Sequence, residues 1–225
     1  MRANQTLQIA LVISVTALIV VFVGQYALNK FLNTMLVSKL VPFIQKWEGG
    51  LSRDPKDTAS ANPAPWSYKG QTGWHTNKGV TYSTFKSIAP KVGYAVTAEN
   101  FFSMPDALWY KILENGFMKA FPLSKISHLP RIQAVIISWA WGSGPGGAER
   151  YLANFQRQVM GIQDSNITPT EIVENFKKRI NPLNEKEWFL KLCDRRAQDF
   201  SKMATYSVHG KGWINRLNDF RKTFA

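Results

Sequence analysis

The stretch WEGGLSRDPKD, from Trp47 to Asp57, marks the point where a predicted helix gives way to a predicted loop. Upstream of it, apolar side chains recur at the spacing of one helix face, at Val37, Leu40, Val41, Ile44 and Trp47. The pair Gly49-Gly50 predicts the end of this helix, because glycine adopts the left-handed conformation of a helix cap. Glu48 is therefore expected in the last helical turn, next to a loop that carries Asp54 and Asp57.

Glu48 is a candidate general acid. A carboxylic acid donates a proton at neutral pH only where burial or nearby negative potential opposes its ionisation. Trp47 adjoins Glu48, and the C-terminal end of a helix carries about half a negative charge. Asp54 and Asp57 follow in the loop and supply the second carboxylate that glycoside hydrolysis requires. Residue types alone favour the simpler alternative, in which Glu48 is a surface residue and both aspartates are turn residues.

Most of the chain beyond this stretch is predicted to be helical. Residues 52–79 are rich in Pro, Gly, Ser and Asn and predict loops with at most short strands. Residues 131–141 (RIQAVIISWAW) are apolar on most faces and predict a buried central helix. Further helices are expected after the capping residues Thr168 and Asn184. A cleft between the helical part and the loop-rich lobe after Glu48 is the natural place for a substrate.

The N-terminal region is predicted to cross a membrane. Residues 7–28 form an uncharged run of about 22 residues, and ~20 residues are enough to span the hydrocarbon core. An uncleaved anchor is favoured over a cleaved signal peptide, because the run is long and no clear Ala-x-Ala site follows it. Residues 1–6 are then a short tail and residues 29–36 a stem. The lysines after the span would by charge alone keep the domain in the cytoplasm, so an outward orientation has to be argued from function.

The chain is strongly basic. It has 28 Lys+Arg against 15 Asp+Glu, a net charge of +13, which favours a large anionic partner such as nucleic acid, anionic lipid or a cell-wall polymer. Nucleic acid is not expected, because no helix-turn-helix, ribonucleoprotein or zinc-finger signature is present. With one cysteine and three scattered histidines, a metal site is not expected either.

Four motifs in order along the chain resemble glycoside hydrolase family 108, which comprises lysozyme-like N-acetylmuramidases of phages and bacteria. The first is E-G-G-x-x-x-D-P-x-D, from Glu48 to Asp57. It is followed by T-N-K-G-V-T (76–81) and A-W-G-S-G-P-G-G-A (140–148), and then by K-G-W-I-N-R-L (211–217), which is similar to the end of a peptidoglycan-binding segment. The resemblance extends over about residues 37 to 222.

The resemblance implies a mainly α, lysozyme-like α+β fold with a small loop- or strand-rich lobe. Residues 37–160 are then the catalytic domain, and residues 161–225 a helical, peptidoglycan-binding-like segment packed on it. The implied activity is that of an N-acetylmuramidase, which cleaves the β-1,4 bond between N-acetylmuramic acid and N-acetylglucosamine. Such an enzyme needs neither cofactor nor metal, and a monomer is expected.

The resemblance also assigns site residues. The general acid falls on Glu48, and related phage-type lysozymes place an aspartate nine positions later, which is Asp57, with Asp54 as the alternative. A threonine that helps to place water falls on Thr76, with Thr81 as the fallback and as a substrate contact. The chain departs from the family at an insertion, residues 59–73, at Trp74 and Leu51, and at Ser138 and Gly142, where Asp and Asn are common.

Three aromatic residues gather in and beside the insertion, at Trp66, Tyr68 and Trp74. Flat aromatic faces stack on sugar rings, so these residues are candidates for glycan subsites. An equally weighted alternative is a small apolar cluster that stiffens a long loop.

The expected protein is a peptidoglycan hydrolase anchored in the inner membrane, with its catalytic domain on the periplasmic side. Its basic charge then attracts it to the anionic cell envelope. Two alternatives remain. A lytic transglycosylase uses one glutamate and no second carboxylate, and a non-catalytic membrane-anchored protein would bind the wall without cleaving it.

Overall fold

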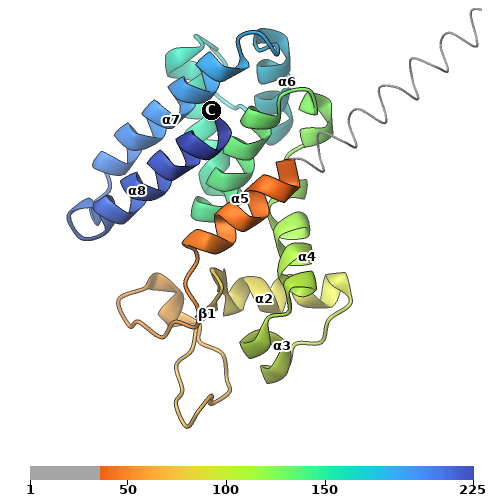
Figure 1. Ribbon diagram of the computed structural model, residues 1–225, viewed down its shortest axis with the longest axis vertical. Coiled ribbons are helices and arrows are strands. Elements are labelled where there is room, and N and C mark those ends of the chain that lie inside the picture. The colour runs from red at the N-terminus through yellow and green to blue at the C-terminus, as the bar shows by residue number, and fades with distance from the viewer. Residues whose placement is uncertain (1–35) are drawn as a thin grey trace, which may run out of the picture.

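The computed structural model describes residues 36–225, which form two halves connected through α4 (Figure 1). The loop-rich half holds the sheet with α2 and α3, and the helical half holds α5 to α8 (Figure 1). In chain order the elements are helix 36–47, η1 (Thr58–Ala61), β1 (Thr76–Asn77), β2 (Val80–Thr81), α2 (Tyr82–Ile88), η2 (Ala89–Val92), α3 (Ala98–Ser103), α4 (Asp106–Gly116), η3 (Met118–Ala120), η4 (Leu123–Ile126), α5 (Pro130–Val159), α6 (Pro169–Arg179), α7 (Glu185–Ser201) and α8 (Tyr206–Phe224). The predicted mainly helical fold with a small strand-containing lobe is confirmed.

No helix within residues 36–225 is long and apolar enough to cross a bilayer. The predicted tail (1–6), membrane span (7–28) and nearly all of the stem (29–36) lie outside the described residues. Membrane anchoring therefore stays a prediction.

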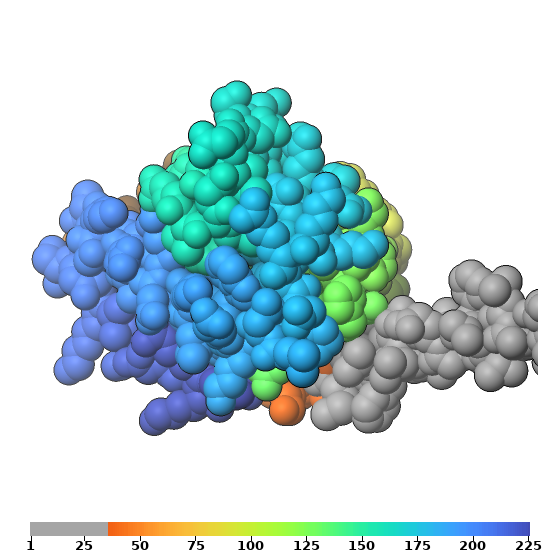
Figure 2. All heavy atoms as spheres, turned by 90° about the horizontal axis from the view of Figure 1, so that it is seen from above, coloured from red at the N-terminus to blue at the C-terminus, as the bar shows by residue number. Residues whose placement is uncertain are grey.

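The predicted central helix is the first part of α5. Its side chains from Ile132 to Trp141 are almost all buried, as expected for a segment that is apolar on most faces. The helix is broken at Gly144, which has φ 70° and ψ 159° and precedes Pro145. Helices α6 and α7 pack against α5, and α8 packs against α7. Figure 2 shows the helical half from above, where α6, α7 and the end of α5 cover the surface.

The helix ends agree with the sequence in part. The capping box at Thr168 is confirmed, because its hydroxyl accepts from Glu171 N and the Glu171 carboxylate accepts from Thr168 N. Helix α7 begins where expected, yet the Asn184 side chain accepts instead from Asn181 N, upstream of the helix. The left-handed cap predicted after residue 47 is wrong, since neither Gly49 nor Gly50 has a positive φ.

A tight hairpin stands in the loop-rich half. Strands β1 and β2 are antiparallel, with Asn77 opposite Val80, and the two residues between them, Lys78 and Gly79, both have positive φ. That geometry is typical of the two-residue turns that match the twist of paired strands. The turn is held in place because Trp109 Nε1 of α4 donates to the Lys78 carbonyl over 3.0 Å. The hairpin thus has one defined position relative to α4.

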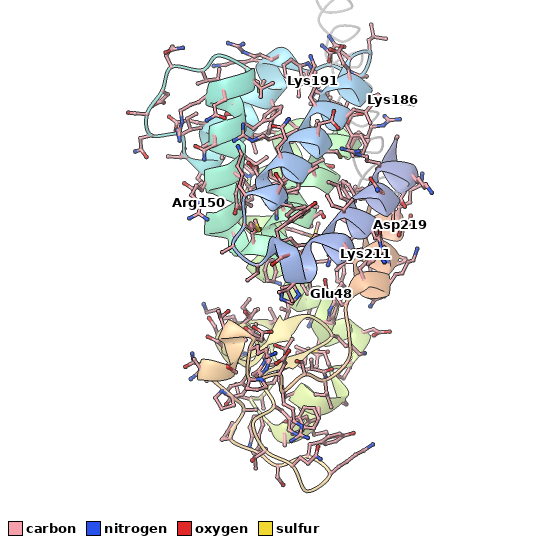
Figure 3. The ribbon with its side chains drawn as sticks, turned by 90° about the vertical axis from the view of Figure 1, so that its left-hand side faces the viewer. Glu48, Arg150, Lys186, Lys191, Lys211 and Asp219 are labelled. Carbon is pink, nitrogen blue, oxygen red and sulfur yellow. The ribbon has the colours of Figure 1, made fainter. Side chains whose placement is uncertain are left out.

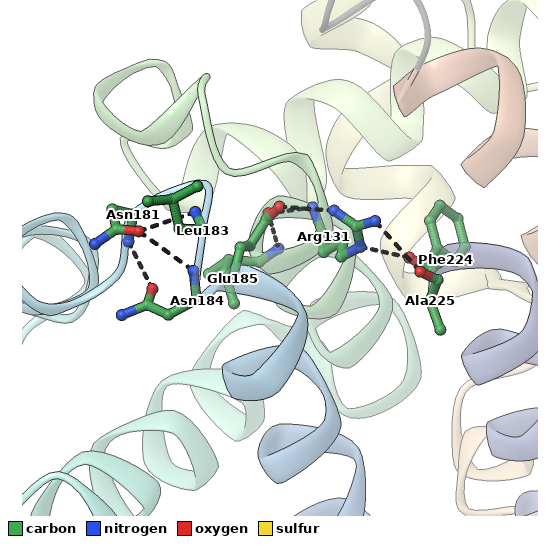
Figure 4. A network of polar contacts seen from close by, with 8 residues as sticks. Arg131, Asn181, Leu183, Asn184, Glu185, Phe224 and Ala225 are labelled. Carbon is green, nitrogen blue, oxygen red and sulfur yellow. Dashed lines mark hydrogen bonds and ion pairs between the residues drawn. The ribbon is translucent and has the colours of Figure 1, made fainter.

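The C-terminus is tied to the start of α5 (Figure 4). Glu185 is buried, and its Oε1 accepts from the backbone nitrogens of Arg131 and Ile132 in the first turn of α5. Arg131 in turn donates to Glu185 Oε2 and to the backbone carbonyls of Phe224 and Ala225. A buried carboxylate at a helix N-terminus satisfies backbone N–H groups that have no partner inside the helix. This network fixes α8 against the rest of the chain.

Candidate active site

Glu48 lies where the two halves meet (Figure 3). It follows helix 36–47 directly, and its side chain is 15% exposed. Its Oε1 accepts two hydrogen bonds of 2.7 Å, one from Trp141 Nε1 of α5 and one from Arg216 Nη1 of α8. The carboxylate is therefore held by residues from two distant parts of the sequence, in a charge-assisted geometry.

The other oxygen of Glu48, Oε2, faces the hairpin. A Cβ atom added to Gly79 would lie 2.2 Å from it, which is far inside van der Waals contact. Gly79 also has φ +76°, so both its backbone conformation and its close approach require a residue without a side chain. Within residues 36–225 no hydrogen bond to Oε2 is recorded. One carboxylate oxygen is thus fixed and the other remains available.

Trp141 is held firmly in its position. Its ring packs against Trp109 and Phe117, with centroid distances of 5.1 and 4.9 Å, and it is 8% exposed. Trp109 is the residue that also anchors the hairpin. The same aromatic cluster therefore positions both the donor to Glu48 and the turn that lies beside its second oxygen.

The ring nitrogen of Trp47 is directed at α8. Its Nε1 donates to Asp219 Oδ2 over 2.7 Å, and Lys46 Nζ lies 2.8 Å from the same oxygen. These contacts, first with Lys46 and then with Trp47, hold the pKa of Asp219 below its usual value. Trp47 thus serves to attach helix 36–47 to α8.

Asp54 and Asp57 are exposed and hydrogen bonded within their own loop. Asp54 Oδ1 accepts from Lys56 N, and Asp57 Oδ1 accepts from Ala59 N at the start of η1, both over 2.9 Å. No contact of either side chain with Glu48 or Thr76 is recorded within residues 36–225. Both positions have the local role of turn residues, and their catalytic assignment stays a prediction.

The two candidate threonines lie opposite each other in the hairpin. Thr76 Oγ1 is 3.0 Å from Nδ1 of the buried His75, whose Nε2 is 3.1 Å from the Asp54 carbonyl. Thr81 caps α2 instead, since its Oγ1 accepts from Thr84 N. His75 therefore connects the hydroxyl of Thr76 to the loop that carries the candidate aspartates, a role that the sequence did not indicate.

The three aromatic residues in and beside the insertion are half-buried, and two of them, Trp66 and Tyr68, pack on α3. Trp66 packs on Phe101 with its ring tilted and on Phe102 edge-on. Tyr68 stacks on Phe102 with a centroid distance of 4.6 Å. Tyr68 also contacts Trp74 edge-on. These contacts fit the alternative of an apolar cluster that stiffens the loop, and a sugar-binding role stays a prediction.

Sequence reasoning missed four residues around the site: His75, Gly79, Trp141 and Arg216. Gly79, Trp141 and Arg216 fall within the motifs quoted above, but residue type alone did not assign them a role. Among residues 36–225 no group of three or more His, Cys, Asp or Glu is arranged to hold a metal ion.

Comparisons with known proteins point to one family and one fold. Residues 41–144 match the sequence model of the family Glycosyl hydrolase 108, and this segment contains Glu48, Gly79 and Trp141. The structure of Brucella abortus SagA is similar, with a TM-score of 0.56 and 19% sequence identity; the alignment covers 82% of this chain and 91% of that chain. No curated protein matches the chain. The chain thus shares the fold of SagA, while the family match ends before α6 to α8, so the peptidoglycan-binding role of residues 161–225 stays a prediction.

Proposed function

We propose that the protein is a peptidoglycan hydrolase, an N-acetylmuramidase that cleaves the β-1,4 bond between N-acetylmuramic acid and N-acetylglucosamine. The observation that carries the proposal is the setting of Glu48, which lies inside the segment that matches Glycosyl hydrolase 108 and between the two halves of the fold. An arginine and a tryptophan hold this carboxylate in one orientation at the junction, as is expected of a residue that acts on a bound substrate rather than of a free surface residue.

In the proposed reaction Glu48 protonates the glycosidic oxygen through Oε2. Trp141 and Arg216 both donate to Oε1, so they orient the carboxyl group without occupying the second oxygen. Because Gly79 has no side chain, the hairpin lies close to Oε2 without displacing it. Pre-orientation of this kind lowers the barrier because the acid need not be ordered during the reaction.

Asp57, or alternatively Asp54, positions the attacking water, with Thr76 as its neighbour. The link from Thr76 through His75 to the Asp54 carbonyl supports this assignment, because it ties the loop of both aspartates to the hairpin. Asp164 is a matched control, since it is also exposed and accepts from the backbone nitrogen two residues later. Asp57→Asn or Asp54→Asn should lower the rate of wall cleavage, and Asp164→Asn should not.

The products of peptidoglycan digestion test the reaction directly. Mass spectrometry of muropeptides should show reducing N-acetylmuramic acid ends with the full chain and none with Glu48→Gln. Unchanged digestion by Glu48→Gln would remove the catalytic assignment of Glu48, whereas no digestion by the full parent chain would leave a protein that only binds the wall.

A lytic transglycosylase is the second candidate. It is favoured by the two aspartates, which are hydrogen bonded within their own loop and, within residues 36–225, form no hydrogen bond with Glu48. Such an enzyme forms 1,6-anhydro ends, so the same mass spectra distinguish it. It also predicts that Asp54→Asn and Asp57→Asn digest the wall at the rate of the Asp164→Asn control.

The proposal includes anchoring through residues 7–28, with the catalytic domain on the periplasmic side where peptidoglycan lies. The uncharged N-terminal run and the net charge of +13 support it, since a basic domain is attracted to an anionic envelope. Membrane fractionation of cells that express the full chain tests the anchoring. Protease treatment of spheroplasts then tests whether the catalytic domain lies on the periplasmic side.

A further inference from the structure

A cavity of about 170 Å³ lies between α5, α7, α8 and helix 36–47. Its walls are mainly aromatic and aliphatic, but two arginines line it, Arg196 of α7 and Arg216 of α8. The small residues Ser138 and Gly142 of α5 also line it, and Gly142 is exposed. Because one water molecule needs only ~10–15 Å³ of such space, the cavity has room for a small organic molecule.

Arg196 is a buried cation with incomplete hydrogen bonding. Its side chain is held between three aromatic rings, with its Cζ 4.7 to 5.1 Å from the ring centroids of Phe200, Tyr151 and Trp139. Its Nη2 donates to Ser143 Oγ, but Nη1 is buried without a partner in the described part of the chain. The residue as a whole is 5% exposed, so bulk water does not replace the missing acceptor.

Arg216 has the same incomplete bonding. Its Nη1 donates to Glu48, whereas its Nη2 is buried and has no partner among residues 36–225. The two guanidinium groups also repel each other. The pKa of Arg196 is lowered to about 10, chiefly by burial and to a smaller extent by the charge of Arg216, while Tyr151 and Asp199 act in the opposite sense. An anion between the two arginines would offset this repulsion.

We propose that this cavity binds a small carboxylate, which bridges Arg196 and Arg216. A planar carboxylate matches the fork of an arginine side chain, and the apolar walls require that the rest of the molecule be small and aliphatic. Arg216 then lies between the bound carboxylate and Glu48 and contacts each of them. If the proposed function holds, the C-terminal carboxylate of a wall peptide that ends in D-alanine has the required chemistry; binding itself does not depend on that function.

Calorimetry with the full chain in detergent micelles tests the site without any enzymatic readout. Sodium propionate should bind saturably, and propionamide, which has the same shape without the charge, should not bind at equal ionic strength. Equal responses to the two compounds, or none to either, would overturn the proposal whether or not the protein cleaves peptidoglycan.

Arginine variants locate the site. Arg196→Met should weaken propionate binding at least about tenfold, because it removes a charged hydrogen-bond donor from a buried site. Lys211→Met removes one positive charge from an exposed position on α8 (Figure 3) and should leave the affinity within about twofold of the parent protein. An equal loss in both variants would mean that only overall charge matters, which contradicts a specific site.

A second pair of variants covers the case in which Arg196→Met does not fold. Ser138→Asp places a carboxylate of the chain itself in the cavity, so it should raise the thermal midpoint and abolish propionate binding. Ser138→Asn has the same size without the charge and should still bind propionate. Unchanged affinity in Ser138→Asp would overturn the proposal.

The source of the carboxylate is resolved by a second ligand. N-acetyl-D-alanine stands for the end of a wall peptide, and its amide is the control. Tighter binding than propionate identifies a wall peptide, and weaker or equal binding identifies a free carboxylate. Either result supports a carboxylate site, and failure of both acids to bind rejects it.

Discussion

Two glutamate–arginine pairs attach the last helices to the rest of the fold, and they differ in how completely they are satisfied. Glu185 is 2% exposed, and both its oxygens are used, by two backbone N–H groups and by Arg131. Glu48 is 15% exposed, and among residues 36–225 only its Oε1 has hydrogen-bond partners, Arg216 and Trp141. In the Glu185–Arg131 pair both carboxylate oxygens thus accept hydrogen bonds, whereas in the Glu48–Arg216 pair one carboxylate oxygen is left without a donor among residues 36–225.

The difference separates a structural role from a chemical one. A buried carboxylate whose oxygens are both bonded contributes to stability, and its partners leave no site for a reacting atom. A carboxylate with one fixed and one open oxygen is oriented and still able to transfer a proton. Glu185 should therefore matter for folding and Glu48 for catalysis, and each variant below tests one side of this contrast.

Glu48→Gln should lower the rate of peptidoglycan cleavage by about 10²- to 10⁴-fold, because glutamine cannot donate a proton as an acid. Its amide oxygen can still accept from Trp141 and Arg216, so the thermal midpoint should change little. Release of reducing sugar from purified walls measures the rate, and circular dichroism measures the midpoint. A large loss of stability in this variant would erase the distinction between the two pairs.

Glu185→Ala should destabilise the fold by about 2–4 kcal/mol, since it leaves two N–H groups of α5 and the charge of Arg131 without their acceptor. Activity per folded molecule should be retained. The control is Glu187→Ala, two positions later on α7, which removes an exposed pair with Lys191 and should cost at most about 0.5 kcal/mol. Urea titration of both variants gives the comparison, and similar midpoints would contradict the structural role.

Gly79→Ala should lower activity about tenfold or more, because its Cβ would displace Glu48 or the hairpin. Gly70→Ala is the matched control: its φ of +73° is nearly that of Gly79, but nothing lies within 4 Å of the added atom. Both variants should lose about 1 kcal/mol of stability from the backbone strain. Only Gly79→Ala should lose activity as well, and an equal rate in the two variants would argue against close contact with Glu48.

Cys193 should be unreactive in the folded protein. Burial raises the pKa of its thiol to about 12, so at pH 8 the thiolate that reacts with disulfide reagents is almost absent. In Ellman's reagent at pH 8, the native parent protein and native Glu187→Ala should release no thionitrobenzoate within minutes. Both proteins should release one equivalent once they are unfolded in guanidinium chloride. Faster labelling in Glu185→Ala would show that loss of this pair loosens α7.

Local features of the site were predictable, and long-range ones were not. The helix before Glu48, the loops up to the hairpin and the buried first part of α5 follow from hydrophobic spacing and from Pro and Gly content. The capping box at Thr168 follows from four adjacent residues. Trp141 and Arg216 lie 93 and 168 positions from Glu48, and no periodic pattern connects residues that far apart.

The sequence by itself determined the helical character of the chain and the position of the carboxylic acid Glu48 at the end of its helix, because both depend on neighbouring residues. The tertiary structure decided which groups hold that acid, that Trp47 binds Asp219 instead, and that Arg196 and Arg216 face one cavity. The physical reason is that hydrogen bonds between α5, α8 and helix 36–47 exist only once packing has brought those helices together, and packing is set by the whole core.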